Sequence, residues 1–402
     1  MNLRSLLACS LSLLGASACA TSDAPAVGPE LSADPAVAAP ELHFVRTVTL
    51  SDAPYDDDLH QHQIQSGLRA QVTPDPVAAR FERPSDGTFG VMYVDYAQRA
   101  EYVAVYDLED TRTAAAELVK RGMNQASEGT DHLGVPRGWS NDIDNRISFE
   151  DYAVTHSTLR RIGRVSSAAG GCTGALFGPR VVLTAAHCIF DGAGNYLQNV
   201  TFQARRNGSE LPYGSVVSQG VVYPIAYKND GCNISETSSC VKNDWAILIL
   251  PADPWAASPN GSPGYLGVWW AGDSALATFA PRNVGYPGCS NSMPPASCVS
   301  NVAYGDLTCA GVPIAVTDED DRWPLYGTKG KLMNGCDTSP GHSGGPIYSY
   351  SPGSNGPYII GNATWNQCNS STCNAASQYS TAGARISETL AGYMMNLRAT
   401  YQ

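Results

Sequence analysis

Short apolar runs, separated by glycine, proline and asparagine, recur along the chain from residue 162 to residue 364. Runs of this length, bounded by turn-forming residues, are typical of β-strands. Many short strands in succession predict an all-β sandwich or barrel. The predicted strands cover residues 162–166, 172–177, 181–183, 200–204, 216–223, 245–250, 283–286, 347–350 and 358–364.

The pattern differs at the two ends of this region. Before it, residues 89–94 and 102–106 are predicted to form two strands. Residues 111–123 are predicted to form a helix, because the apolar positions of this range recur at helical spacing. After it, residues 384–400 are predicted to form an amphipathic helix. We therefore expect a small α+β unit, then an all-β part, then a C-terminal helix.

The first 20 residues predict a secretory signal peptide. Arg4 supplies a positive charge, residues 6–14 are mostly apolar, and residues 18–20 (Ala-Cys-Ala) are small enough for cleavage. The apolar run is too short to span a bilayer. We therefore expect export to the extracellular space or the periplasm. Lipidation at Cys19 is an alternative use of the same residues.

Acidic residues are concentrated in the first third of the chain. The formal net charge is −12 over 402 residues. Residues 1–137 contain 10 Lys and Arg against 19 Asp and Glu, a balance of −9, and residues 138–402 have a balance of −3. No region is basic enough to favour nucleic acid as a partner. Residues 21–58, rich in Ala, Pro, Asp and Ser, predict a flexible, acidic lead-in.

A polar stretch at residues 134–145 marks the expected boundary between the front unit and the all-β part. The front unit is acidic and has no cysteine after the signal, whereas the following part is rich in cysteine. This contrast favours a propeptide, residues 21–137, followed by a separate domain, residues 138–402. Arg137 is a candidate processing site, and an accessory binding domain is the alternative interpretation of the front unit.

Ten of the 12 cysteines follow residue 170. An even number in an exported chain implies disulfides. A zinc site is disfavoured, since no Cys-X-X-Cys pair occurs and histidines do not cluster near the cysteines. Proximity in sequence suggests Cys172–Cys188, Cys232–Cys240, Cys289–Cys298, Cys309–Cys336 and Cys368–Cys373, with Cys336–Cys368 as an alternative.

A serine lies between glycines in residues 341–346, Gly-His-Ser-Gly-Gly-Pro. Serine is a poor nucleophile until a base takes its proton, and a glycine turn exposes its hydroxyl and aims backbone N–H groups at a developing oxyanion. A candidate base, His187, lies in Thr-Ala-Ala-His-Cys just after the predicted strand 181–183. A candidate carboxylate, Asp244, precedes the strongly apolar strand 245–250, where a buried carboxylate needs a partner such as a histidine N–H.

These motifs, in the order His, Asp, Ser, resemble those of the chymotrypsin-like or trypsin-like serine proteases over about residues 160–400. The resemblance implies two packed six-stranded Greek-key β-barrels with the site in the cleft between them. It implies His187 as general base, Asp244 as the group that orients it, and Ser343 as nucleophile. It also implies an oxyanion hole made by the backbone N–H groups of Gly341 and Ser343.

The resemblance extends to the substrate-binding positions. Ala363, Thr364 and Trp365 match the family's substrate-pairing strand, whose backbone pairs with an extended peptide. The pocket walls are expected from this strand and from the segment that begins with Asp337 and Thr338. Asp337 stands where trypsin-type members place the aspartate that binds Arg or Lys, so a preference for cationic side chains is one expectation. Preferences for Glu and for small or apolar side chains stay open.

Two departures point to one branch of the family. His342 replaces the aspartate that pairs with a new N-terminus in zymogen-activated animal members, and no Ile-Val-Gly-Gly start precedes His187. The motif style is closer to bacterial glutamyl endopeptidases, in which the N-terminal segment of the mature chain has a role near the pocket. Ala363 replaces the pocket histidine of the glutamate-cleaving members, which leaves that specificity open. His342 itself is interpreted as a structural or solvent-facing residue, not as the base.

The sequence therefore predicts a secreted serine endopeptidase, made as a preproprotein, that acts through an acyl-enzyme intermediate. Its expected partners are protein or peptide substrates, without nucleic acid or a membrane span, and we expect a monomer. No metal and no cofactor are expected for the chemistry. The alternatives are a catalytically silent homologue that binds peptides and an esterase with the same triad.

Overall fold

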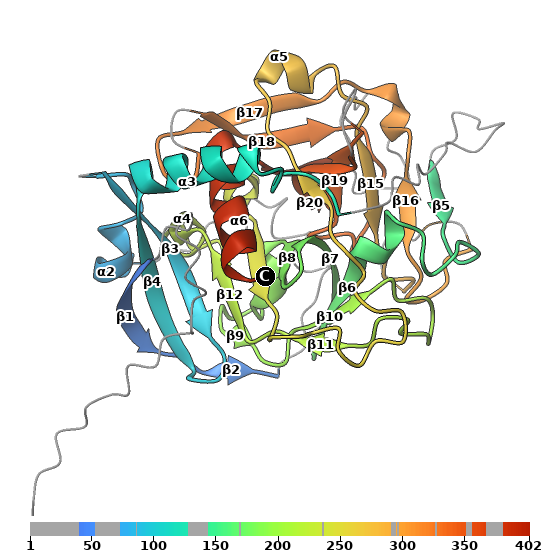
Figure 1. The fold of residues 1–402 in the computed structure, drawn as a ribbon, viewed down its shortest axis with the longest axis horizontal. Helices are drawn as coiled ribbons and strands as arrows, with labels where there is room; N and C mark the ends of the chain where they lie inside the picture. The colour runs from blue at the N-terminus through green and yellow to red at the C-terminus, as the bar shows by residue number, and fades with distance from the viewer. Residues whose placement is uncertain are drawn as a thin grey trace, which may run out of the picture. The chain divides into compact units, whose positions relative to one another are not determined.

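The structure is a computed structural model of the chain. It describes residues 40–52, 73–85, 87–127, 144–168, 170–234, 237–290, 295, 297–325, 328–350, 356–366 and 381–402. These residues are mostly β-strand with few helices, as the apolar runs predict (Figure 1). None of the described helices is long and apolar enough to cross a membrane.

The first large sheet has ten strands and joins the front of the chain to its middle. We call the described part of residues 40–127 the front segment. It supplies three strands, and its β3 pairs in antiparallel register with β12. Across the sheet the strands are β1 (Glu41–Thr47), β4 (Ala100–Asp107), β3 (Thr88–Asp95), β12 (Gly220–Tyr223), β13 (Ala246–Ile249), β8 (Val181–Thr184), β7 (Gly170–Gly178), β6 (Ile162–Ser167), β10 (Thr201–Ala204) and β11 (Val216–Val217).

The second large sheet has nine strands, drawn mainly from the last third of the chain. The short β14 (Gly267–Val268) pairs with β20 in parallel, and the other neighbours are antiparallel. In order the remaining strands are β17 (Ala315–Asp320), β18 (Thr328–Asn334), β21 (Thr381–Arg385), β20 (Tyr358–Asn366), β19 (Pro346–Ser349), β15 (Arg282–Gly285), β16 (Tyr304–Asp306) and β5 (Arg146–Ser148). A small parallel pair joins β2 (Leu50–Ser51) to β9 (Tyr196–Leu197).

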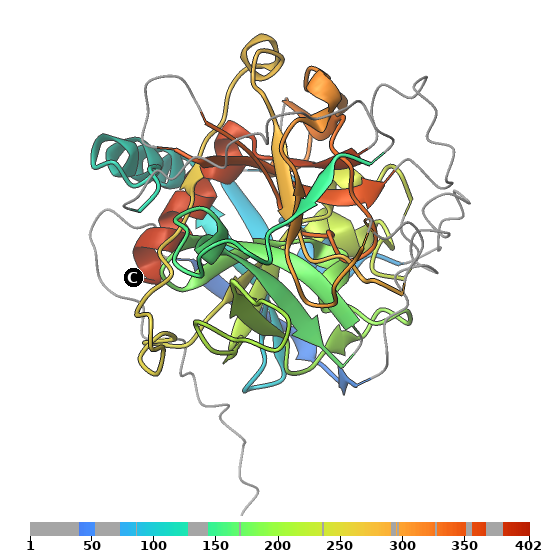
Figure 2. The same cartoon turned by 90° about the vertical axis from the view of Figure 1, so that its right-hand side faces the viewer.

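Two helices of 13 residues, α3 (Leu108–Lys120) and α6 (Glu388–Thr400), lie side by side in both views (Figures 1 and 2). Helix α3 begins before the predicted residue 111, because the Asp107 side chain accepts the N–H of Asp110 and caps the helix. Helix α6 begins after the predicted residue 384, capped by Ser387. The shorter helical elements are α2 (Pro76–Ala79), α4 (Ile225–Asn229), α5 (Asp273–Leu276), η1 (Leu159–Arg161), η2 (Ala186–Ile189), η3 (Val241–Asn243) and η4 (Cys309–Gly311).

The central strands of the first sheet lie in the core. All four residues of β8 and all four of β13 are buried, in keeping with their near-continuous apolar sequences. The two strands pair antiparallel, with Thr184 opposite Ala246. The end of β8 and the start of β13 therefore lie at the same edge, and the chain segments attached there are brought together.

Some strands differ from the prediction. The predicted strand 216–223 divides into β11 and β12, and β18 and β21 carry no apolar run that would reveal them. All five residues of β21 are buried, and the small side chains of residues 382–384 allow close packing against β20. A Cβ atom on Gly383 would lie 1.7 Å from the carbonyl oxygen of Asn362.

Several predictions lie outside the described residues. They are the signal peptide at residues 1–20 with Cys19, the processing site at Arg137, and the pair Cys368–Cys373. The division of the all-β part into two six-stranded barrels stays a prediction.

Candidate active site

His187 is held just beyond the end of a central strand. It follows β8 within η2, and its side chain is 2% exposed. The neighbouring Cys188 forms a disulfide with Cys172 of β7, with an S–S distance of 2.07 Å. The disulfide ties the histidine loop to the adjacent strand and so limits the movement of a ring whose misplacement would slow catalysis.

Asp244 receives two contacts from His187. Its Oδ1 accepts the backbone N–H of His187 at 2.9 Å, and its Oδ2 lies 2.7 Å from Nδ1 of the imidazole. The carboxylate is fully buried, so it needs such partners. When Nδ1 carries the proton that faces the carboxylate, Nε2 is the basic nitrogen, which is the tautomer that a general base requires.

An amide from the second sheet fixes the main chain beside this pair. Asn362 of β20 donates from Nδ2 to the carbonyl oxygens of Asp244, at 3.0 Å, and of Thr184, at 3.1 Å. The side chain is fully buried. One amide therefore holds the main chain at the end of β8, before His187, and at Asp244. The sequence predicts no role for Asn362, although a polar side chain inside the predicted strand 358–364 is a signal for one.

The loop of Ser343 packs directly against the histidine loop. Thr173 of β7 donates its N–H to the carbonyl oxygen of Ser343 at 2.8 Å, and Sγ of Cys188 lies 3.8 Å from the same oxygen. Glycine is required at position 344, where φ is +80°, because a Cβ would lie 2.3 Å from Oγ1 of Thr184. The structure therefore brings the loops of the three predicted catalytic residues together.

Gly341 shapes the turn before the serine. Its φ is +96°, and a Cβ there would lie 2.4 Å from the carbonyl oxygen of Tyr286. Within the described part of the chain, neither the N–H of Gly341 nor that of Ser343 donates to a backbone carbonyl, whereas the N–H of Gly345 donates to His342 O at 2.7 Å. The two N–H groups predicted to form the oxyanion hole are therefore not used by the backbone.

His342, next to Ser343 in the sequence, has a buried side chain. Burial, and then the positive charge of Arg146, lower the pKa of His342 to about 3. Its ring packs over Gly285, where a Cβ would come within 2.6 Å of the ring. The imidazole is neutral at ordinary pH, which agrees with a structural residue and not with a solvent-facing one.

Asp337 is engaged by the chain itself. Its Oδ2 accepts the backbone N–H of Asn145 at 2.7 Å. Burial raises the pKa of Asp337 to about 7; this hydrogen bond opposes the rise, and the charges of Asp306 and Asp144 add to it. The carboxyl group therefore keeps its proton to a higher pH than an ordinary aspartate does, unlike the fixed negative charge expected of a residue that selects Arg or Lys.

Residues 144–146, at the start of β5, contact the loop that begins at Asp337 and is predicted to form one wall of the substrate pocket. Arg146 forms a bidentate ion pair with Asp144, with Nε–Oδ1 and Nη2–Oδ2 distances of 2.9 and 2.8 Å, and its Nη1 donates to Oγ of Ser339 at 2.6 Å. The hydroxyls of Thr338 and Thr381 lie 2.7 Å apart on the other side of the loop. The sequence predicts a linker near Arg146, and because its partner Ser339 is 193 residues away, no local pattern reveals the contact.

The predicted substrate-pairing strand abuts the serine loop. Ala363 donates its N–H to the carbonyl oxygen of Gly345 at 2.8 Å and accepts the N–H of Gly344 at 2.6 Å. The ladder between β20 and β21 pairs Ala363 and Trp365 but skips Thr364, which lies at a local irregularity. The strand predicted to bind substrate is therefore hydrogen-bonded, through Ala363, to the loop that contains Ser343.

Four disulfides are present among the described residues. Because Cys336 is bonded to Cys309, the alternative pairing of Cys336 with Cys368 is wrong. Cys172 and Cys188 lie with His187 within 4.8 Å, but both sulfurs belong to the disulfide and so are not thiolates, the form in which cysteine binds metals. The four pairs are Cys172–Cys188, Cys232–Cys240, Cys289–Cys298 and Cys309–Cys336.

Comparison with known proteins places this geometry in a family. The model of the Trypsin family matches residues 153–382. A glutamyl endopeptidase of Bacillus licheniformis is 25% identical over 284 residues, which cover 70% of this chain and 77% of that protein. An extracellular metalloprotease of Bacillus subtilis is 28% identical over 183 residues, 46% of this chain and 47% of that protein.

Among solved structures, one of Glu endopeptidase in complex with MPD matches with a TM-score of 0.46 and 16% identity, covering 64% of this chain and 98% of that chain. The family match spans more than half of the chain and contains all three candidate catalytic residues. The chain therefore belongs to the trypsin family and is a serine endopeptidase.

Proposed function

We propose that this protein is a secreted serine endopeptidase whose triad is Ser343, His187 and Asp244. The observation that carries the proposal is the buried pair of His187 and Asp244, in which one carboxylate holds both the backbone N–H and the ring of the histidine. A surface histidine would not need two such contacts. A catalytic histidine does, because its tautomer and its direction must both be fixed.

The proposed reaction follows from these positions. Ser343 Oγ attacks the peptide carbonyl while Nε2 of His187 takes its proton, and Asp244 stabilises the imidazolium that forms. The N–H groups of Gly341 and Ser343 bind the oxyanion of the tetrahedral intermediate. His187 then protonates the leaving amine, an acyl-enzyme remains on Ser343, and water releases it by the same route in reverse.

The proposed substrate contacts lie on β20 and on the pocket loop. The irregularity at Thr364 leaves the strand a place at which an extended peptide can pair, beside Ala363 and Trp365. A carboxyl group whose pKa is raised, as that of Asp337 is, is a weaker partner for Arg or Lys near neutral pH than a fully ionised one would be. Asp337 and Thr338 would then limit the depth of the pocket, and any preference for basic residues would strengthen as the pH rises above 7.

We also propose that the protein is made as a preproprotein. Residues 1–20 direct export, cleavage in the stretch around Arg137 separates the acidic propeptide, residues 21–137, and the protease domain is residues 138–402. Disulfides among the described residues are in keeping with folding in an oxidising compartment. Sequencing the N-terminus of the mature protein tests the cleavage site directly.

Labelling with a fluorophosphonate tests the nucleophile. The processed protein should be labelled, Ser343→Ala should not, and Ser274→Ala should be labelled like the parent because Ser274 is an exposed residue of α5. Equal labelling of Ser343→Ala would refute the proposed nucleophile. A folded protein that takes no label and still binds peptides would be the catalytically silent homologue.

A further inference from the structure

The front segment continues the sheet that carries the catalytic base. Four residue pairs join β3 to β12, from Gly220 opposite Asp95 to Tyr223 opposite Met92. β12 in turn pairs with β13, the strand that follows Asp244. If the front segment departed, β12 would become an exposed edge with unpaired backbone groups, which is unfavourable and promotes aggregation.

A buried acid of the front segment reaches into the rest of the protein. The side chain of Glu101 is fully buried, and its Oε1 accepts the hydroxyls of Tyr196, at 2.6 Å, and of Tyr223, at 3.2 Å. Lys228 forms an ion pair with the same carboxylate. Burial alone would raise the pKa of Glu101, but Lys228, Tyr196 and Arg46 lower it below its usual range. Without Glu101, Lys228 would keep a largely buried ammonium and lose this carboxylate, which is costly.

Aromatic rings and an arginine extend the same interface. Phe89 is fully buried and stacks on Trp323, with ring centroids 4.1 Å apart and an interplanar angle of 11°. Glu82 accepts Nη1 of Arg322 at 2.8 Å and Nδ2 of Asn229 at 2.7 Å. The interface therefore joins apolar burial to charged pairs, as stable protein interfaces do.

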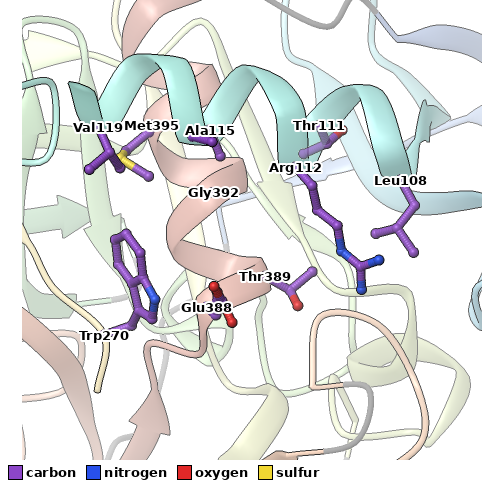
Figure 3. Close-up of a pocket in the computed structure, with 11 residues that line it drawn as sticks. Leu108, Thr111, Arg112, Ala115, Val119, Trp270, Glu388, Thr389, Gly392 and Met395 are labelled. Atoms are coloured by element: carbon purple, nitrogen blue, oxygen red, sulfur yellow. The ribbon is translucent and has the colours of Figure 1, made fainter. Parts of the chain in front are cut away.

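The two long helices also pack against each other. A Cβ on Gly392 of α6 would lie 3.0 Å from that of Ala115 of α3, and Leu118 of α3 is buried in a cluster with Met395 and Ala399 of α6. Beside this crossing lies a cavity of about 490 Å³. Trp270, Val119 and Met395 gather at one of its ends (Figure 3). The helix contact therefore adds apolar burial to the strand pairing and to the contacts of Glu101 and Phe89.

The contacts of the front segment lie away from the catalytic residues. Among the described residues, its contacts reach β9, β12, α4 and α6, and also Arg161, Gln198, Gln219, residues 265–268 and residues 321–323. None of these contacts involves His187, Asp244 or Ser343. A propeptide that inhibits by filling the cleft has to contact it. The described front segment instead completes a sheet and a core at the side of the domain.

We propose that the front segment remains bound, without a covalent link, after the chain is cut near residue 137, as a permanent subunit of the active enzyme. This inference rests on the proposed processing. Cleavage would separate the stretch that leads to β5 from the front segment, but it would not release residues 40–127 from the protein. The partner of the protease domain is thus a segment of its own chain.

The test uses the full-length Ser343→Ala chain with the recognition sequence of a site-specific protease inserted after residue 137. After complete cutting, both fragments should elute together from gel filtration at the volume of the uncut chain. Elution of the front fragment on its own would overturn the proposal. Because Ser343→Ala needs no activity, a chain that fails the fluorophosphonate test could still pass this one, and the two proposals can fail separately.

Matched variants locate the attachment. In the cut chain, Glu101→Ala should weaken the association of the fragments by about a hundredfold or more, since it leaves Lys228 without its buried partner. Glu109→Ala, which removes an exposed glutamate of α3, should behave as the parent. Circular dichroism of the uncut variants shows whether each one folds. Naturally processed, active enzyme should contain the front segment by intact mass, and its absence there would also overturn the proposal.

Discussion

Asp244 is fully buried and Asp337 is half-buried, and the groups that surround the two aspartates differ in charge. Asp244 faces an imidazole and a backbone N–H, and both lie within hydrogen-bond distance of its carboxylate. Asp337 has a backbone N–H but also two other carboxylates nearby, and its pKa is raised to about 7. Burial by itself does not assign a role to an aspartate. The charge of its neighbours decides whether it acts as a fixed anion or as a titrating group.

The comparison is tested most strongly by Asp244→Asn. The amide cannot hold the basic tautomer of His187, so kcat should fall by roughly 10⁴-fold while KM changes little. Asp253→Asn, at an exposed aspartate, is the control and should keep parental kinetics. Steady-state assays on a peptide substrate measure both, and a loss of kcat below about tenfold would contradict the role given to Asp244.

Asn362→Ala tests whether the two hydrogen bonds of Asn362 position His187 and Asp244. The variant loses both hydrogen bonds to the carbonyls of Thr184 and Asp244, so kcat should fall roughly tenfold to a hundredfold. The free energy of unfolding should fall by about 1–3 kcal/mol. Asn260→Ala removes an exposed amide that also donates to a carbonyl, and it should change neither quantity measurably. If the two variants behave alike, Asn362 does not position the pair.

Asp337→Asn tests the raised pKa of Asp337 through the pH dependence of stability. The pKa of Asp337 is 3.8 in its ordinary state and about 7 in the fold, so between these values only the unfolded chain releases the proton. The parent should therefore lose stability relative to Asp337→Asn as the pH rises from 4 to 7, on the order of 2–4 kcal/mol, with no further loss above that window. Urea unfolding at several pH values measures the difference, and parallel curves for the two proteins would refute the raised pKa.

Arg146→Gln should give the smallest effect and sharpen the assignment. The positive charge of Arg146 lowers the pKa of Asp337, so its removal should move the stability transition to higher pH, by less than about one pH unit. Since Arg146 also holds Ser339, KM should rise more than kcat falls. A transition that stays in place would show that Arg146 does not act on Asp337.

The sequence predicts one side of this comparison far better than the other. His187, Asp244 and Ser343 lie in short motifs next to apolar strands, and the geometry of β8 and β13 follows from those strands. The surroundings of Asp337 come from Asn145, Asp144 and Asp306, which are distant in sequence and lie in stretches without a strong pattern. Local pattern fixes local structure, whereas the pKa of a group depends on whatever the fold places beside it.

The same limit applies to the front segment. Its strands and helix are predictable from spacing, but their attachment to β12 is not, because the apolar run of β3 indicates a buried strand and not which strand lies at its edge. Asn362 and β21 were hidden for a related reason. The hydrogen bonds of Asn362 reach residues more than a hundred positions away, and the small residues of β21 form no apolar run, so the sequence does not show what either one contacts.

The pairing of β3 with β12 also bears on the order of folding. β3 and β4 form a hairpin whose strands are joined by a short turn, so their contacts are local and form quickly. β12 joins that hairpin across more than a hundred residues, and such distant pairing is slow because a long loop must close first. The hairpin precedes β12 and β13 in the chain and so is synthesised first, and it should be in place as a template when they arrive. The rate at which Asp244 reaches His187 in a newly made chain should then depend on a segment that touches neither residue.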